Sequence, residues 1–190
     1  MIVLLDGNPK SDGLCRSLTD AILEGVRQTG ATVVRLDTCD RRLQRCQICG
    51  TGWGICRSEH RCSFGDDGFS FMQSQIQQAA GYIIVTPVYW HEMAEGLKSF
   101  LDRLRRCEAQ YPSPLRGRGA LLLASAGGSG NGILPCLEQM ERFCRHVGLT
   151  VYDRLGANRW NADWVREAAR EAGQGFAQFI LDPLAPGPGR

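Results

Sequence analysis

The sequence has 190 residues, of which 43% are hydrophobic and 22% are charged, and its formal net charge is +2. These proportions are typical of a globular protein with a sizeable core and exclude a disordered or fibrous chain. The charge is nearly balanced and no basic stripe is interleaved with aromatic residues, so we expect no nucleic-acid partner. No apolar run approaches the roughly 20 residues that cross a bilayer, so we expect no membrane partner either.

The N-terminal stretch MIVLLDGNPK has neither a basic leader nor a small-residue cleavage site. We therefore expect no secretion signal and a cytoplasmic protein, in which thiols stay reduced. The chain has nine cysteines, an odd number, so complete disulfide pairing within it is impossible.

Five short, nearly continuous apolar runs predict buried strands, because strands of a parallel sheet are covered on both faces. They span 1–6, 31–37, 81–87, 119–126 and 149–154. Between and after them, apolar residues recur at helical spacing, and the basic run DRLRRC over 102–107 is interpreted as the solvated face of one such helix. The alternation predicts a doubly wound α/β sheet with helices on both faces. Five strands favour the flavodoxin-like order 2-1-3-4-5.

We expect one domain over 1–182, followed by a flexible tail over 183–190 that is rich in proline and glycine. In open parallel sheets, ligands bind beyond the carboxyl ends of the strands. Three loops at those ends have unusual compositions, and together they predict one binding site.

The first loop is GNPKSDGLC, over 7–15, between the first strand and the first helix. Asn8, Lys10 and Ser11 offer hydrogen-bond donors, and the following helix has the N-terminal N–H groups that attract phosphate. The loop matches neither GxxxxGK[ST] nor GxGxxG, so both common nucleotide fingerprints fail. An ordinary strand–helix turn would have a similar composition.

The second loop is TPVYWHEM, over 86–93. We expect Pro87 to end the third strand, and Tyr89 and Trp90 to suit a flat ring ligand. Alternatively, these rings cap the core. We expect His91 to be a polar residue at a helix N-terminus rather than an acid–base catalyst.

The third loop is SAGGSGNG, over 125–132. Its four glycines leave backbone N–H groups free to approach a polar ring edge. A flexible linker would have a similar composition, although linkers do not usually interrupt a strand–helix pair.

The segments GNPKSDG, TPVYWHEMAEGLKSFLDRL and GGSGNG resemble the NADPH-dependent FMN reductase family of flavodoxin-like proteins, over most of the chain from Met1 to about Val147. By that resemblance the ligand is FMN. Its phosphate would lie on the first loop, at Asn8, Lys10, Ser11, Gly13, Leu14 and Cys15. Its ring system would lie between Pro87, Val88, Tyr89, Trp90 and His91 on one side and Gly127 and Gly128 on the other.

The sequence departs from the family at the phosphate loop. Leu14 and Cys15 stand where the family often has side-chain donors, and Lys10 stands where arginine is frequent. Lysine offers a point charge instead of a planar fork. The resemblance implies a hydride taken from NADH or NADPH and electrons passed to an acceptor that the sequence does not name. It assigns no side chain as a catalytic acid or base, and it implies a homodimer or homotetramer.

The segment CQICGTGWGICRSEHRC holds Cys46, Cys49, Cys56 and Cys62 at the spacing C-x2-C-x6-C-x5-C. Four thiolates so close in sequence can complete a tetrahedral zinc site or a cubane cluster. The segment is also similar to the compact motif of iron–sulfur flavoproteins, which has only two residues between the second and third cysteines.

Three interpretations of the segment stay open: a [4Fe–4S] cluster that exchanges electrons with FMN, structural zinc, or reduced thiols in a loop anchored by Trp53. A zinc-stabilised module that binds a partner and no flavin is a further alternative for the whole chain. We expect the cysteines to lie near the same rim of the sheet as the flavin.

Overall fold

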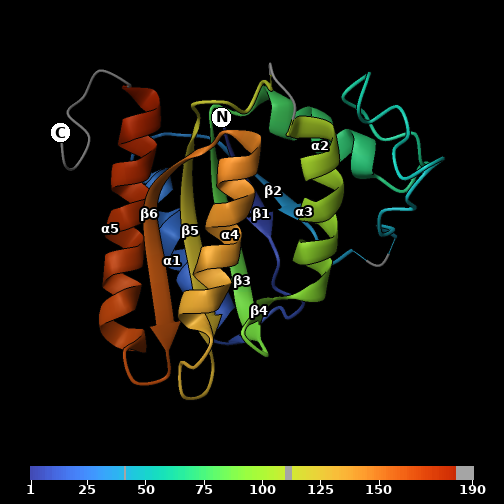
Figure 1. Ribbon diagram of the computed structural model, residues 1–190. Helices are drawn as coiled ribbons and strands as arrows, with labels where there is room; N and C mark the ends of the chain where they lie inside the picture. Colours follow the sequence, from blue (N-terminus) through green and yellow to red (C-terminus); the bar gives the residue numbers. More distant parts are fainter. Residues whose placement is uncertain (41, 110–112, 183–190) are drawn as a thin grey trace.

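The computed structural model describes residues 1–40, 42–109 and 113–182, so the predicted tail over 183–190 lies outside the described residues. A parallel sheet forms the centre, in the order β2-β1-β3-β5-β6 (Figure 1). Its strands are β1 (Ile2–Asp6), β2 (Val33–Asp37), β3 (Gly81–Tyr89), β5 (Gly119–Ala126) and β6 (Thr150–Asn158). Among the five long strands this is the order 2-1-3-4-5, which confirms the predicted fold class. A sixth strand, β4 (Glu92–Met93), was not predicted and pairs antiparallel with the end of β3.

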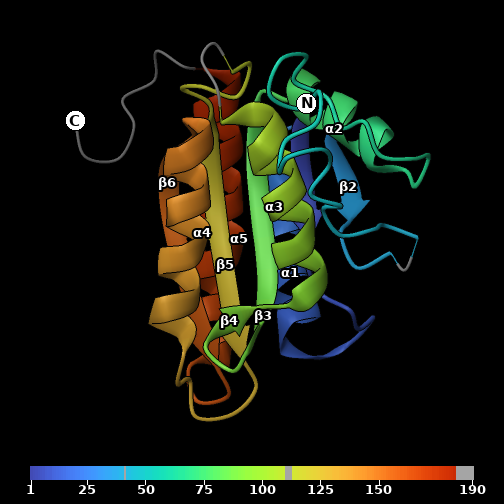
Figure 2. The same cartoon turned by 45° about the vertical axis from the view of Figure 1, so that its right-hand side comes forward.

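Helices cover both faces of the sheet (Figures 1 and 2). One face carries α1 (Gly13–Arg27) and α5 (Ala162–Leu181), and the other carries α2 (Phe69–Gln78), α3 (Glu95–Glu108) and α4 (Ile133–Val147). Successive strand residues enter opposite cores: Leu4 packs with α1 and α5, and Leu5 with the other three helices. This double burial produces the continuous apolar runs in the sequence. None of the helices in the described ranges is long and apolar enough to span a bilayer.

Helices α1 and α5 pack backbone against backbone through two glycines. A Cβ on Gly25 would lie 1.9 Å from the Arg170 carbonyl oxygen, and one on Gly173 would lie 2.2 Å from the Ile22 carbonyl oxygen. Both distances are far below any van der Waals contact, so only glycine fits at these positions.

The outer strand β6 has an irregular register against β5. Ala120 pairs with Val151, but Leu121 pairs with Asp153, so Tyr152 is an extra residue in β6. Such a bulge increases the local twist of an edge strand.

Candidate functional site

Three loops meet at the carboxyl ends of the strands, at the lower edge of Figure 1. The Gly7 amide donates to the Val85 carbonyl oxygen (2.9 Å), which ties the first loop to β3. The Cys15 thiol lies within hydrogen-bonding reach of Ser125 at the end of β5. In the third loop, a Cβ on Gly132 would lie 2.6 Å from the His91 Cα. The predicted loops therefore form one continuous rim.

The first loop presents unsatisfied donors. Asn8 is only 8% exposed, its side-chain oxygen accepts from the Lys10 amide (3.2 Å), and its Nδ2 has no partner among the residues that the structure describes. Helix α1 begins at Gly13 without a side-chain cap and without an acidic residue in its first turn. A buried donor beside free helical N–H groups fits an anion such as phosphate.

The remaining predicted residues of this loop differ in how they face the rim. Lys10 and Ser11 are exposed, whereas Leu14 is half-buried and Cys15 is buried. Burial raises the pKa of the Cys15 thiol to about 11, although the hydrogen bond with Ser125 opposes this. Leu14 and Cys15 can thus contribute only their backbone amides to a phosphate site.

The second loop is a β-hairpin, which corrects two expectations. Pro87 does not end the strand, because β3 continues to Tyr89 and gains a new partner in β4, with Val88 opposite Met93. His91 does not begin a helix. It lies in the hairpin turn, and α3 starts at Glu95.

The turn of this hairpin is strained. Trp90 and His91 have φ angles of 50° and 71°, in the left-handed region that two-residue hairpin turns require and that glycine or asparagine usually fills. Each such residue costs about 1–3 kcal/mol, and strain of this kind gathers at functional sites.

The two aromatic rings next to the turn are open to solvent. Trp90 is 94% exposed and Tyr89 is 43% exposed. The alternative that the rings cap the core is therefore wrong. In the third loop, a Cβ on Gly127 or Gly128 would meet no atom within 4 Å. The rim thus combines exposed rings with bare backbone that is open to solvent, a combination that fits a flat ligand.

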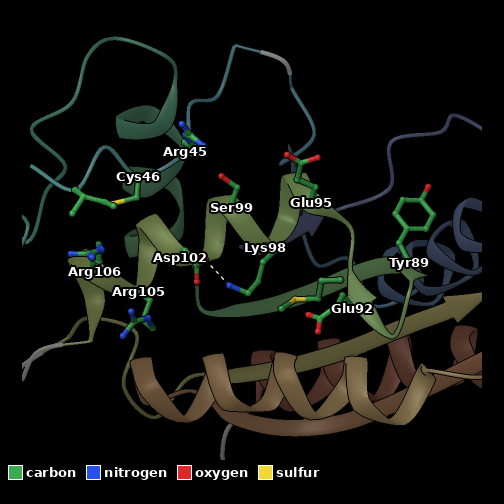
Figure 3. A pocket seen from close by; sticks show the side chains of 12 residues that line it. Arg45, Cys46, Tyr89, Glu92, Glu95, Lys98, Ser99, Asp102, Arg105 and Arg106 are labelled. Carbon is green, nitrogen blue, oxygen red and sulfur yellow. Dashed lines mark hydrogen bonds and ion pairs between the residues drawn. The ribbon is translucent and has the colours of Figure 1, made fainter. Parts of the chain in front are cut away.

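A groove of about 730 Å³ runs from this rim along the outer face of α3 (Figure 3). Tyr89 and Glu95 line its rim end, and Arg105 and Arg106 line the far end. We call it the α3 groove. In the sequence, the groove is indicated only by charged positions along α3, and the basic run over 102–107 among them predicts a solvated face.

That interpretation is wrong for the buried half of the run 102–107, which includes Arg103 and Cys107 beside Leu104 of the apolar stripe. Arg103 and Cys107 are 2% and 1% exposed. They lie one helical turn apart and face the chain segment that carries the four predicted metal ligands.

The cysteine segment, over 46–62, lies beside the C-terminal half of α3, away from the rim (Figures 1 and 2). The Arg106 guanidinium donates to the Gly52 carbonyl oxygen (2.6 Å) and lies 4.6 Å from the centre of the Trp53 ring. The expectation that the cysteines lie at the flavin rim is therefore wrong. Contacts with α3 hold the segment near the opposite end of the helix.

Arg103 fixes the borders of this segment. Its guanidinium pairs with the Asp67 carboxylate (2.5 Å), donates to the Gln44 carbonyl oxygen (2.7 Å) and lies 4.1 Å from the centre of the Phe69 ring. It also lies 3.4 Å from the Cys62 Sγ. One buried side chain thus binds the chain on both sides of the four cysteines.

The cysteines line one small cavity of about 20 Å³, which we call the thiol cavity. Cys46, Cys49, Cys56 and Cys62 are joined there by Cys107 of α3. This set of donors suits zinc or an iron–sulfur cluster. Within the described ranges, however, no three histidine, cysteine or acidic side chains are close enough to hold a metal ion as they stand. Metal binding would require the segment to rearrange around the cavity.

Comparison with known proteins places the chain among flavoproteins. The family model for NADPH-dependent FMN reductase matches residues 1–162. The chain is similar to an iron–sulfur flavoprotein of Methanocaldococcus jannaschii, with 21% identity over 94% of this chain and 96% of the relative.

Solved structures have the same fold. An NAD(P)H:quinone oxidoreductase from Methanothermobacter marburgensis matches with a TM-score of 0.67 and 16% identity, over 92% of this chain and 93% of the other. An FMN-dependent NADH-azoreductase from Bacillus anthracis matches with a TM-score of 0.68 and 13% identity, over 95% and 99%. At such identities these likenesses establish the fold alone.

Proposed function

The chain belongs to the NADPH-dependent FMN reductase family, and we propose that it is an FMN-dependent oxidoreductase that takes electrons from NAD(P)H and passes them to a small-molecule or protein acceptor. The observation that carries this proposal is the rim itself. The rim carries two kinds of group: the unpartnered Asn8 amide with the uncapped α1 N-terminus, and the exposed rings of Tyr89 and Trp90. An anion-binding end and an aromatic end are the two features that a phosphorylated ring cofactor needs.

The residues present fit FMN. Asn8, Lys10, Ser11 and the first amides of α1 would hold the phosphate, and the hairpin over 87–91 with Gly127 and Gly128 would hold the ring system. When bound, FMN would accept a hydride from the nicotinamide and deliver the two electrons to the acceptor. The chain's own part is to orient the ring and to keep one face of it open to the donor.

The α3 groove supports a dinucleotide donor. Glu95 and Arg106 are 11 residues apart on one helix, so the groove extends roughly 16 Å from the rim at 1.5 Å per residue. The side chains of Arg45 and Arg105, in its half away from Tyr89, have no partner among the described residues and could meet phosphate groups.

Flavin titration tests the cofactor. We expect apo-protein to quench FMN fluorescence at one site per chain. Asn8→Ala should weaken binding about 10- to 100-fold, because a hydrogen bond to a charged group is worth about 1.5–3 kcal/mol. Gln178→Ala, at an exposed position on α5, is the matched control. Unquenched FMN at saturating protein, or unchanged binding by N8A, would contradict the site.

Reduction tests the activity separately. The FMN-loaded protein should lose its flavin absorbance when mixed anaerobically with NADH or NADPH, and the ratio of the two rates gives the donor preference. A protein that binds FMN but keeps its absorbance with both donors would be a flavin carrier and no reductase. The predicted homodimer or homotetramer is tested by sedimentation velocity.

A second candidate function is electron transfer through FMN together with a metal centre. It is favoured by the five thiols that line one cavity. Purification without oxygen, followed by assays of iron, sulfide and zinc per chain, tests it. Iron with equal sulfide would support a cluster, zinc alone would support a structural site, and neither would leave the reductase without a second centre.

A further inference from the structure

The thiol cavity contains one cysteine more than a metal centre needs. A tetrahedral zinc site or a [4Fe–4S] cubane takes four protein thiolates, and this cavity is lined by five. Four come from the segment over 46–62, and the fifth, Cys107, comes from the last turn of α3. Cys107 is 1% exposed and belongs to the core that packs α3 against the sheet. It is therefore the thiol whose position is fixed best.

The part of the segment that carries Cys56 and Cys62 is bound to this same turn. The His60 Nδ1 hydrogen-bonds to the Cys107 carbonyl oxygen (3.0 Å). Cys56 and Cys62 both pack against the core cluster that contains Cys107. These three thiols thus gather on the inner side of the cavity.

Cys46 lies on the side of the thiol cavity that faces the α3 groove, unlike Cys56, Cys62 and Cys107. It borders the thiol cavity and also lines the open α3 groove (Figure 3). Of the five cysteines, only this one contributes to both spaces. Cys46 is thus nearer to solvent, and Cys107 is nearer to the core.

A second observation points to a ligand that brings negative charge. The Arg103 side chain is 2% exposed and lines the cavity, yet its Nε has no partner among the residues that the structure describes. Buried donors are rarely left unsatisfied in folded proteins. A centre bound by several thiolates would supply acceptors on this wall, since sulfur ligands of such centres commonly receive hydrogen bonds.

We propose that Cys107 is a protein ligand of a thiolate-bound metal centre, together with Cys56 and Cys62. The centre is a zinc ion or an iron–sulfur cluster, and the inference rests on the second candidate function. A ligand on a packed helix is held more rigidly than one on a loop. Helix α3 would then set the position of the centre, and the segment would rearrange around it when metal binds.

Metal content of single variants tests this proposal. Wild type, Cys56→Ser, Cys107→Ser and Cys136→Ser are purified without oxygen and reconstituted in parallel, once with iron and sulfide and once with zinc. Cys136 is a matched control because it is fully buried in α4, outside the cavity. We expect C107S to lose most of its metal, as C56S does, while C136S keeps it. If C107S held the wild-type amount while C56S lost it, the proposal would be overturned.

A measurement on the wild-type chain covers the case in which C107S fails to fold. The protein is labelled with ¹³Cβ-cysteine and loaded with ¹¹³Cd, and we expect the Cys107 resonance to shift and to couple to cadmium. Coupling confined to the four cysteines of the segment would overturn the proposal. A wild type that takes up no metal would overturn it together with the second candidate function. FMN titration of the same samples shows whether the flavin site stands regardless.

Discussion

Replacing Arg103 with methionine tests whether one buried ion pair holds the cysteine segment in place. Methionine keeps most of the aliphatic stem and removes the guanidinium, together with the contact between the guanidinium and the Phe69 ring. The Asp67 side chain, only 8% exposed, would then keep just its amide donors, from Gln44 (2.8 Å) and Phe69 (3.2 Å). Removing one partner of a buried pair costs about 3–5 kcal/mol. Because two hydrogen bonds to Asp67 remain, we expect about 3 kcal/mol.

At this chain length, 1 kcal/mol corresponds to about 2–4 °C, so Tm should fall by about 6–12 °C. The assay is thermal unfolding followed by circular dichroism, with hydrogen exchange over 44–67 as a local measure. Arg142→Met is the matched control, because Arg142 and its partner Glu138 are 61% and 59% exposed. A surface pair of this kind is worth about 0–1 kcal/mol.

The dependence on pH gives a sharper test of the same pair. Burial would raise the pKa of Asp67, but the hydrogen bonds from Arg103, Gln44 and Phe69 outweigh it and lower this pKa below 3.8. A lowered carboxyl pKa contributes stability above the unfolded value, and the contribution disappears as pH falls through the folded value. The difference in Tm between wild type and R103M should therefore be full at pH 7 and shrink below about pH 4. A difference no larger than that of R142M, or one unchanged down to pH 3, would refute the reasoning.

Three further predictions concern the hairpin, the helix pair and the buried thiols. Trp90→Gly should raise the free energy of unfolding of the apo-protein by about 1 kcal/mol, because it relieves a left-handed φ at a 94% exposed position. The same change should weaken FMN binding. Urea unfolding measures the first effect and flavin titration the second, and a lower free energy of unfolding would contradict the proposed strain at Trp90. Gly25→Ala should lower the free energy of unfolding by about 3 kcal/mol or more, since its Cβ would lie 1.9 Å from the Arg170 carbonyl oxygen. An unchanged urea midpoint would contradict this, because it would show that α1 and α5 can move apart at little cost. Burial raises the pKa of the Cys15 thiol to about 11 and those of Cys136 and Cys144 to about 12, against 9.0 when unfolded. Their stability contribution is therefore full below pH 9 and falls above it by about 1.4 kcal/mol per thiol per pH unit. Thermal scans from pH 7 to 10.5 should show that Tm falls beyond pH 9, and that it falls less steeply in C136A than in wild type. Parallel curves of Tm against pH for wild type and C136A would show that the Cys136 thiol does not contribute to this fall.

Much of the fold could be predicted from the sequence, because a doubly covered sheet requires apolar residues on both faces of each strand. The helix faces were predicted less accurately. The helical spacing of the apolar residues from Trp164 to Ile180 predicts that Trp164 lies on the buried face of α5. Trp164 is instead 65% exposed, and the neighbouring Val165 is buried. A one-residue error in helical phase leaves the spacing of apolar residues almost unchanged, so periodicity alone could not detect it.

The candidate site was predicted only in part, because its remaining features depend on tertiary partners. Proline usually ends a strand, but Pro87 lies inside β3 because β4 folds back to pair with the strand's last residues. The place of the cysteine segment depends on Arg103 and Arg106, whose contacts lie 34 or more positions away in the chain. No local pattern encodes contacts at such separations.

The bulge at Tyr152 affects whether a strand of a second molecule could pair with the edge strand β6. An edge strand offers free backbone groups on which a foreign strand could add. In β6 the extra residue interrupts that ladder near its start, after Thr150 and Val151, and the neighbouring Asp153 and Arg154 are exposed charges. This border is thus poorly suited to templating fibrils.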